Sequence, residues 1–378
     1  MSTVVAPPFL PASPVVSARP TGRRIVGIDL ARGLALVAMC TQHVTIEGPD
    51  GGESSGWVAW LFRESAGRAS VVFFALAGVS LALITAGGSS SAEPKALRRR
   101  GVALTGIGLA LTGTIWEASI LQHYGVAFLL APWLIRASRR TLAVIAAAGL
   151  LLGPVALLGV WSVDEEVTGV ADGTLLDPVI ETVWDIVATG YYPMIVWIGF
   201  FACGLLVGRL DLRRASVIGW LAAVGVIVAV AADLVVGALG GPAEMGAAQL
   251  LDTTGHSGMT GWTVQTGGMA LAAIAAALAL PTAVSRRLGP VVTTGSMSLS
   301  AYLLHIALVA GVFSFGVAPL GWSVGAQEAA FLGLVTAMIA TCVALGRWHR
   351  VGPAEWVMKR IATPRQGSFQ PEPGSAVR

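Results

Sequence analysis

The chain has 378 residues, of which 55% are hydrophobic and only 12% are charged, and its mean hydropathy is +0.75. Soluble globular domains carry about 25% charged residues, so this composition excludes an ordinary water-soluble protein. The net charge of +3 and the lack of a large basic block in the sequence exclude a nucleic-acid footprint. The sequence therefore predicts an all-α, polytopic membrane protein.

Ten apolar runs, in chain order, are long enough to cross a bilayer, which takes about 17–25 residues. The runs are continuous rather than alternating in polarity, which argues against a barrel. The third and fourth runs are separated only by a tight turn at Glu117–Ser119. We expect ten transmembrane helices at residues 27–46, 69–86, 101–117, 119–135, 141–161, 192–208, 215–239, 264–283, 290–316 and 327–346.

The distribution of basic residues predicts the orientation. With the N-terminus in the cytoplasm, 21 of the 24 Lys and Arg residues fall on the inner face, and every inner loop is positive. The outer face keeps only Arg63 and Arg68, while Arg32 lies within the first span. We therefore predict that both termini are cytoplasmic and that the protein lies in the plasma membrane.

Composition also suggests how the chain is divided. Residues 1–24 form a flexible cytoplasmic tail, residues 25–346 the single transmembrane domain, and residues 361–378, rich in Pro, Gly and Ser, a disordered tail. Residues 347–360 are basic and aromatic, and they are predicted to lie in the cytoplasmic interface of the membrane.

Ionisable residues at membrane depth cost about 2.5 kcal/mol or more, so each is a candidate functional residue. In the predicted spans and at the turn they are Asp29, Arg32, His43, Glu117, His123, Asp233 and His305.

The first predicted span carries three of these residues on a regular spacing. Asp29 and Arg32 are i,i+3 neighbours that can pair on one helix face. Arg32 and His43 are eleven residues apart, close to a whole number of turns, so they share a face about 16 Å apart along the axis. The spacing is equally compatible with an Arg32 that only extends to the interface beside Asp29 and a His43 that is only interfacial.

This geometry suits transfer of an acyl group from coenzyme A. Arg32, paired with Asp29, would bind the phosphates of a cytoplasmic acyl-CoA, and the pantetheine arm would carry the thioester toward His43. A neutral His43 would then take the proton from an acceptor hydroxyl or amine. Residues predicted toward the outer side would shape the acceptor site; they are Arg68, Glu117, His123, His256 and His305. Two of them have an alternative interpretation: His256 as a solvated loop residue, and His305 as a residue that only hydrogen-bonds a neighbouring helix.

Several stretches resemble known membrane acyltransferases. The Arg-x10-His spacing of Arg32 and His43 resembles enzymes of the acyltransferase-3 type, and GIDLARGLALVAM resembles the start of heparan-alpha-glucosaminide N-acetyltransferase-like proteins. Stretches such as HSGMTGW and TGSMSLSAYLLHI resemble the bacterial YeiB-like group of the same superfamily. The heparan-type enzymes carry a key histidine after the first span, whereas residues 44–68 contain none, which shifts that role to His43.

The resemblance implies an acyl-CoA dependent transmembrane acyltransferase. It would move an acyl group, acetyl being the first expectation, to a hydroxyl or amine of an extracytoplasmic cell-envelope glycan or glycolipid. The sequence has no spacing typical of a metal site, and no metal is expected. Two alternatives stay open at this point: a proton-coupled transporter or exporter, for which buried His and Asp residues would serve as a relay, and a non-catalytic partner in envelope assembly.

Overall fold

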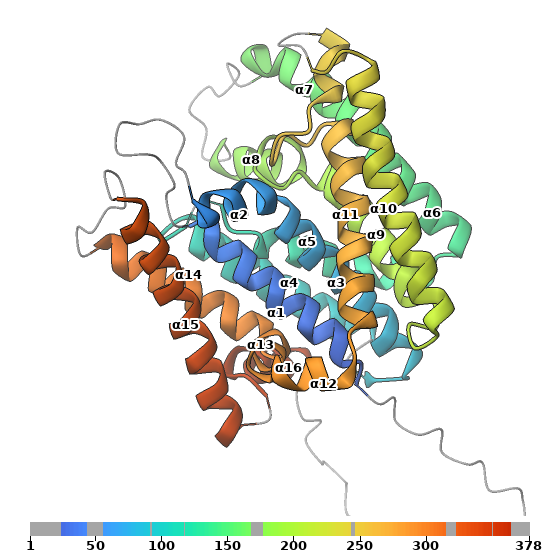
Figure 1. Ribbon diagram of the computed structural model, residues 1–378. Helices are drawn as coiled ribbons and strands as arrows, with labels where there is room; N and C mark the ends of the chain where they lie inside the picture. The colour runs from blue at the N-terminus through green and yellow to red at the C-terminus, as the bar shows by residue number, and fades with distance from the viewer. Residues whose placement is uncertain are drawn as a thin grey trace, which may run out of the picture.

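The computed structural model describes residues 24–43, 56–90, 93–116, 118–167, 177–242, 246–314, 323–349 and 351–363. These residues form a bundle of helices and contain no strand (Figure 1). The helices are α1 (Val26–Thr41), α2 (Trp57–Ser65), α3 (Arg68–Ala86), α4 (Pro94–Thr112), α5 (Leu121–Leu134), α6 (Arg139–Ala147), α7 (Gly153–Val167), α8 (Asp177–Trp184), α9 (Met194–Gly208), α10 (Ala215–Ala238), α11 (Thr260–Ala279), α12 (Thr282–Arg287), α13 (Gly289–Ser296), α14 (Ser298–Ser314), α15 (Val324–Trp348) and α16 (Pro353–Ala362).

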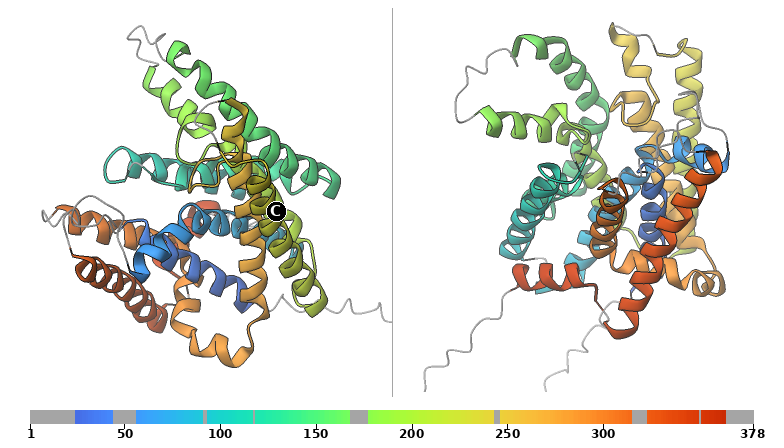
Figure 2. Two further views of the ribbon diagram at one scale, coloured as in Figure 1. Left: turned by 45° about the horizontal axis from the view of Figure 1, so that its top comes forward. Right: turned by 90° about the vertical axis from the view of Figure 1, so that its left-hand side faces the viewer.

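Helix α1 lies near the middle of the bundle and packs against α3, α11 and α13. Helices α14 and α15 lie on one side of α1, and α9, α10 and α11 lie on the other (Figures 1 and 2). Close approach of α3 and α9 depends on glycine, because a Cβ on Gly204 would overlap the backbone of Ala75. Small residues at such crossings are typical of helix packing in membranes, where backbones approach closely.

Each of the ten predicted spans coincides with a helix or a pair of helices, but fewer of them qualify as spans. Among the described residues, five helices are long and apolar enough to cross a membrane, or up to seven if each of two bent pairs forms one span. Helices α1 and α5 are short, with 16 and 14 residues. The apolar helices place the chain in a lipid bilayer, whereas the count of ten and the cytoplasmic termini stay predictions.

Two details of the predicted spans are wrong. The range 290–316 is not one continuous helix, because α13 and α14 meet at a bend of 94°. The predicted tight turn between the third and fourth spans is a longer connection, since α4 ends at Thr112 and α5 begins at Leu121. A helix, α2, also forms where the sequence suggested only a loop.

Helix α16 holds the broken end of α14 in place. The Glu355 carboxylate on α16 accepts hydrogen bonds from the backbone N–H groups of Leu299 (2.7 Å) and Ser300 (3.2 Å). The Ser300 hydroxyl in turn accepts one from the N–H of Ala354 (3.0 Å). Each helix therefore satisfies free N–H groups at the start of the other, which is where a negative charge is most stabilising.

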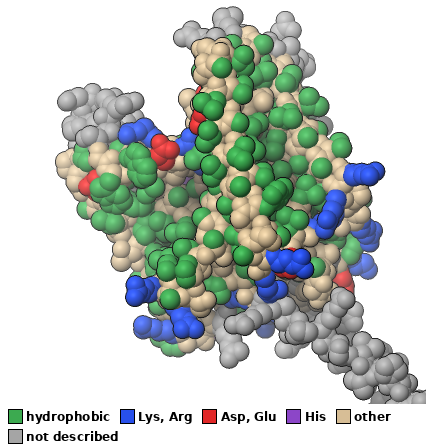
Figure 3. All heavy atoms as spheres, turned by 45° about the vertical axis from the view of Figure 1, so that its right-hand side comes forward, with side chains coloured by type: hydrophobic (Ala, Val, Ile, Leu, Met, Phe, Trp, Pro, Cys, Tyr) green, Lys and Arg blue, Asp and Glu red, His purple; other side chains and the backbone are tan. Residues whose placement is uncertain are grey.

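The surface agrees with insertion in a bilayer. Figure 3 shows a broad hydrophobic area across the middle of one face, with most Lys and Arg side chains in the lower half. The start of α1, α12 and α16 lie at that lower end of the bundle (Figure 1). The charge pattern predicts this end to be cytoplasmic, and we refer to the opposite end as the predicted outer end.

Candidate active site

Arg32 lies on the side of α1 that faces the interior of the bundle. Its guanidinium donates to the Asp29 carboxylate at 3.1 Å, as the i,i+3 spacing predicts, and also to the hydroxyl of Ser80 on α3. Asp29 is 4% exposed and accepts a second bond from Arg24. Arg32 therefore points toward α3 within the bundle rather than out along the helix.

A second arginine lies near Arg32. Arg100 on α4 packs over the ring of Phe128, with its guanidinium carbon 4.5 Å from the ring centroid. Its Nε is buried and has no hydrogen-bond partner in the described part of the chain. From the sequence, Arg100 was expected only as one of the positive charges on the inner face of the membrane. Its position in the run Arg98–Arg100 is the one sequence signal for the helix face on which it lies. Two guanidinium groups near each other fit an anion with several phosphates.

His43 and His305 come together in the structure. His43 follows the end of α1, and its ring centroid lies 5.1 Å from that of His305 on α14 and 4.3 Å from Trp116, which it meets edge-on. His305 is fully buried, and neither of its ring nitrogens makes a hydrogen bond of ordinary geometry with a described residue, although the Ala301 and Tyr302 carbonyls lie near. Nδ1 of His43 is also unpartnered within the part of the chain that the structure describes.

Tyr302 extends this buried group toward α5. Its ring centroid is 5.0 Å from that of His305, and its hydroxyl accepts a bond from the backbone N–H of Ile120 at 3.4 Å. The hydroxyl also contacts the Ser119 side chain, which is fully buried in the connection between α4 and α5. A run of polar groups thus leads from His43 through His305 and Tyr302 to Ser119.

Ser119 also lines a cavity of about 740 Å³ at the predicted outer end. The other walls come from α5, from the turn after α8 and from the loop before α11, and they include Gln122, His123, Asp185, Tyr192 and His256. The Tyr192 ring lies between His123 and His256, with centroid distances of 5.5 and 5.6 Å. Both side chains are buried, and Oε1 of Gln122 has no hydrogen-bond partner among the described residues. Neither nitrogen of His123 makes a bond of ordinary geometry there, although the Ser119 carbonyl lies near.

His256 adopts an unusual backbone conformation. Its φ of 63° makes it the one described non-glycine residue with a positive φ. Its ring packs against Tyr191, Tyr192 and Trp262, and its Nδ1 has no hydrogen-bond partner in the described ranges. Burial lowers the pKa of His256 to about 4, so the ring is neutral at pH 7. A histidine held in this region costs energy, which is typical of functional sites.

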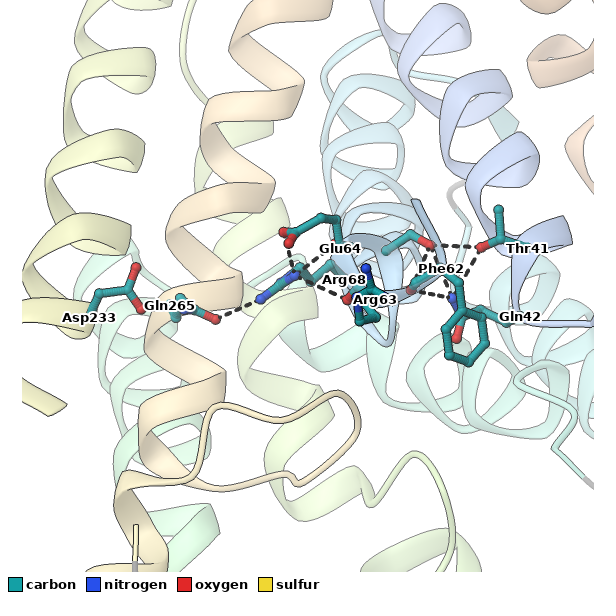
Figure 4. Close-up of polar contacts among 9 residues, drawn as sticks. Thr41, Gln42, Phe62, Arg63, Glu64, Arg68, Asp233 and Gln265 are labelled. Carbon is teal, nitrogen blue, oxygen red and sulfur yellow. Dashed lines mark hydrogen bonds and ion pairs between the residues drawn. The ribbon is translucent and has the colours of Figure 1, made fainter. Parts of the chain in front are cut away.

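The predicted site residues therefore fall into separate groups. His43 and His305 form a pair, and His123 and His256 share the cavity, of which His43 is not a lining residue. Arg68 does not line the cavity; it lines a lateral groove together with Glu64. Its guanidinium donates to the side chains of Glu64 and Gln265 (Figure 4). Glu117 lies outside the described residues. The sequence reading missed Trp116, Asp185 and Tyr192 as site residues; the aromatic pair in TGYYP, next to a predicted span, was the available signal.

Two models of known families match the chain. A family model for the catalytic part of heparan-alpha-glucosaminide N-acetyltransferase matches residues 24–231, which is more than half of the chain. The chain belongs to the heparan-alpha-glucosaminide N-acetyltransferase family. A second model, for a family of proteins of unknown function (DUF418), matches residues 204–365. No curated protein and no solved structure gives a significant match.

The two matches confirm the resemblance to heparan-type and YeiB-like proteins and indicate a membrane transferase of the acetyltransferase type, whereas the Arg-x10-His resemblance to acyltransferase-3 type enzymes stays a prediction. They do not favour the transporter alternative. The matched range includes Arg32, His43 and His123, whereas His256 and His305 fall in the second match.

Proposed function

We propose that this protein transfers an acetyl group from cytoplasmic acetyl-CoA to a hydroxyl or amine of a cell-envelope glycan or glycolipid on the outer side of the plasma membrane. The observation that carries the proposal is the run of buried polar groups from His43 through His305 and Tyr302 to Ser119 at the outer cavity, in which ring nitrogens of both histidines have no hydrogen-bond partner among the described residues. Buried polar groups without partners are rare in proteins, and a bound acceptor would supply the missing hydrogen bonds.

At the cytoplasmic end, Arg32 and Arg100 would bind the phosphates of acetyl-CoA. The Nε of Arg100, which has no partner among the described residues, leaves a donor free for a phosphate oxygen. A guanidinium group can bind a phosphate through two parallel N–H···O hydrogen bonds. The eleven residues from Arg32 to His43 correspond to about 16 Å of helix. The pantetheine arm would cover this distance and bring the thioester beside His43.

In the proposed reaction, His43 acts as the general base. Its neutral imidazole takes the proton of the acceptor hydroxyl or amine while the acceptor oxygen or nitrogen attacks the thioester carbonyl. The C–S bond then breaks, and coenzyme A leaves as the thiol after taking up a proton. His305 would position the His43 ring, because the two imidazoles are in contact and His305 is fully enclosed.

The cavity supports a polyhydroxylated acceptor. It combines tyrosine and tryptophan rings with polar groups from Gln122, His123 and Asp185, and such a mixture is typical of sites that orient a polar ligand. The Asp185 carboxylate is fixed by a hydrogen bond from the Thr189 hydroxyl at 2.7 Å. A fixed carboxylate facing the cavity also suits an amino sugar.

The experiment measures transfer of radiolabel from acetyl-CoA to a cell-envelope extract by the purified full-length chain. His43→Gln should lower the rate by about 10²–10⁴-fold, as expected for loss of a general base. His349→Gln is the matched control, since His349 is exposed beyond the end of α15. Undiminished transfer by folded His43→Gln protein would refute the role of His43, and no transfer by the wild-type chain to any fraction of the extract would refute the proposed function.

A further inference from the structure

A lateral groove lies where α1, α3 and α11 meet, away from the candidate active site. It has a volume of about 230 Å³, and its walls are largely alanine: Ala31, Ala35 and Ala38 on α1, and Ala270 and Ala273 on α11. On the α1 helix these alanines lie roughly 100° around the axis from Arg32, so the groove and Arg32 occupy different sides of the helix. The groove is therefore a separate feature of the molecule.

The groove opens on the outside of the bundle. Leu34, one of its lining residues, is 44% exposed, and Ala273 is also exposed. Since the surrounding helices are membrane helices, this exposed side faces lipid. A hollow lined by small apolar side chains loses packing contacts if nothing fills it, and acyl chains are the apolar molecules present there in excess.

A fixed cation closes one end of the groove. Arg68 is the first residue of α3, and 19 residues of helix put it about 28 Å from the opposite end, which is close to the thickness of the hydrocarbon layer. Its guanidinium donates to the Glu64 carbonyl (2.9 Å), to the Glu64 carboxylate (3.1 Å) and to Gln265 (3.2 Å). Gln265 in turn donates to Asp233 on α10 (Figure 4).

These bonds use the terminal nitrogens of Arg68 but leave its Nε without a partner among the described residues. The Nε is buried, and the side chain as a whole is only 18% exposed. Glu64, which also lines the groove, is 49% exposed, so its ion pair with Arg68 compensates the charge only in part. A buried guanidinium N–H without an acceptor is costly, and a phosphate oxygen is the acceptor that best fits it.

We propose that this groove binds an anionic phospholipid of the outer leaflet, with one acyl chain along the α1–α11 wall and its phosphate on Arg68. The charge is complementary, because Arg68 sits at the level of the lipid phosphates and the groove beyond Glu64, Ser65 and Arg68 is lined by apolar residues. The site takes part in no step of the proposed acetyl transfer. It therefore stands or falls independently of that function.

The test measures lipid binding to the purified full-length chain by native mass spectrometry, comparing phosphatidylglycerol with phosphatidylcholine of the same acyl chains. We expect phosphatidylglycerol to bind at least about tenfold more tightly, and Arg68→Gln to remove that preference. Arg63→Gln is the matched control, because it deletes the neighbouring outer arginine, which does not line the groove. Equal binding of the two lipids, or an equal effect of the two arginine variants, would overturn the proposal.

A second pair of variants tests whether the groove binds an acyl chain. Ala273→Leu fills the groove, whereas Ala276→Leu adds the same volume at an exposed position on the same helix that does not line it. We expect only Ala273→Leu to weaken phosphatidylglycerol binding by about tenfold or more. Glycerol phosphate, which has the anion but no chains, should not compete. Competition by glycerol phosphate, or unchanged binding by Ala273→Leu, would show that the groove does not hold a lipid chain.

Discussion

Replacing Glu355 with alanine tests whether α16 fixes the position of α14. In the folded protein the Glu355 carboxylate accepts bonds from the N–H groups of Leu299 and Ser300 and from the Ser300 hydroxyl at 2.5 Å. The substitution leaves two N–H groups at the start of α14 without an acceptor. It also removes a negative charge from the positive end of the α14 dipole.

The magnitude follows from these contacts. Each hydrogen bond to a charged group contributes about 1.5–3 kcal/mol, and the dipole term adds about 0.3–1 kcal/mol. Glu355 is half-buried, so water replaces part of what is lost. We expect Glu355→Ala to destabilise the protein by about 2–4 kcal/mol, which corresponds to a fall in Tm of about 3–5 °C for a chain of this size.

The assay is thermal unfolding of the purified chain in detergent, with Glu181→Ala as the control because Glu181 is an exposed carboxylate on α8. The control should change the Tm by less than about 1 °C. Because α14 carries Tyr302 and His305, Glu355→Ala should also lower acetyl transfer at temperatures where the chain stays folded. A Glu355→Ala protein as stable as the control would refute the proposed clamp.

Three further predictions concern the site and its packing. Because burial lowers the pKa of His256 to about 4, only the unfolded chain takes up this proton between about pH 6.5 and pH 4, so the stability of the folded protein falls as the pH drops. His256→Asn, in which asparagine tolerates the positive φ, should remove about 1–2 kcal/mol of the stability lost between pH 7 and pH 5. An unchanged pH profile of the Tm would contradict this. Gly295→Ala should lower the Tm by several degrees, because the added Cβ would overlap the Asp29 carbonyl oxygen. Gly311→Ala is the control: its Cβ meets open space, so the Tm should stay unchanged or rise slightly. Equal effects of the two variants would argue against a close α1–α13 crossing. Arg32→Lys should raise the KM for acetyl-CoA about tenfold with a smaller change in kcat, since lysine cannot bind a phosphate through two N–H groups, and an unchanged KM in steady-state kinetics would place the donor elsewhere.

Apolar runs and local spacing were enough to predict the helices and the first ion pair. Each predicted span coincides with a helix because continuous hydrophobicity is a local property of the chain, and the Asp29–Arg32 pair needs only an i,i+3 spacing. The bend between α13 and α14 was less accessible. The run Thr293–Ser300 holds several hydroxyl residues and Gly295, but whether such a run breaks a helix depends on the partners available to the freed N–H groups. Here the partner is Glu355, far along the chain.

The site itself depends on contacts that spacing does not encode. His43 and His305 come from opposite ends of the sequence, and they meet only because α14 packs beside the end of α1. Arg68 has the charge expected of an acceptor-binding residue, but α3 begins on the lipid-facing side, away from the cavity. Charge and predicted depth therefore identify candidate residues, whereas the packing of distant helices decides which of them share a site.

The pattern of unpartnered imidazoles argues for one connected site. Of the five histidines, four have a buried ring nitrogen without a partner among the residues that the structure describes, and the fifth, His349, is exposed at the end of α15. The four lie in two contacting groups, His43 with His305 and His123 with His256 through Tyr192. Tyr302 joins the groups through Ser119, which lines the cavity. Each buried donor or acceptor without a partner costs about 1–3 kcal/mol, so such groups are rare in a core. Those that arise by chance would be scattered through it. The grouping of the four imidazoles along one path is expected if an acceptor or water completes their hydrogen bonds during the reaction.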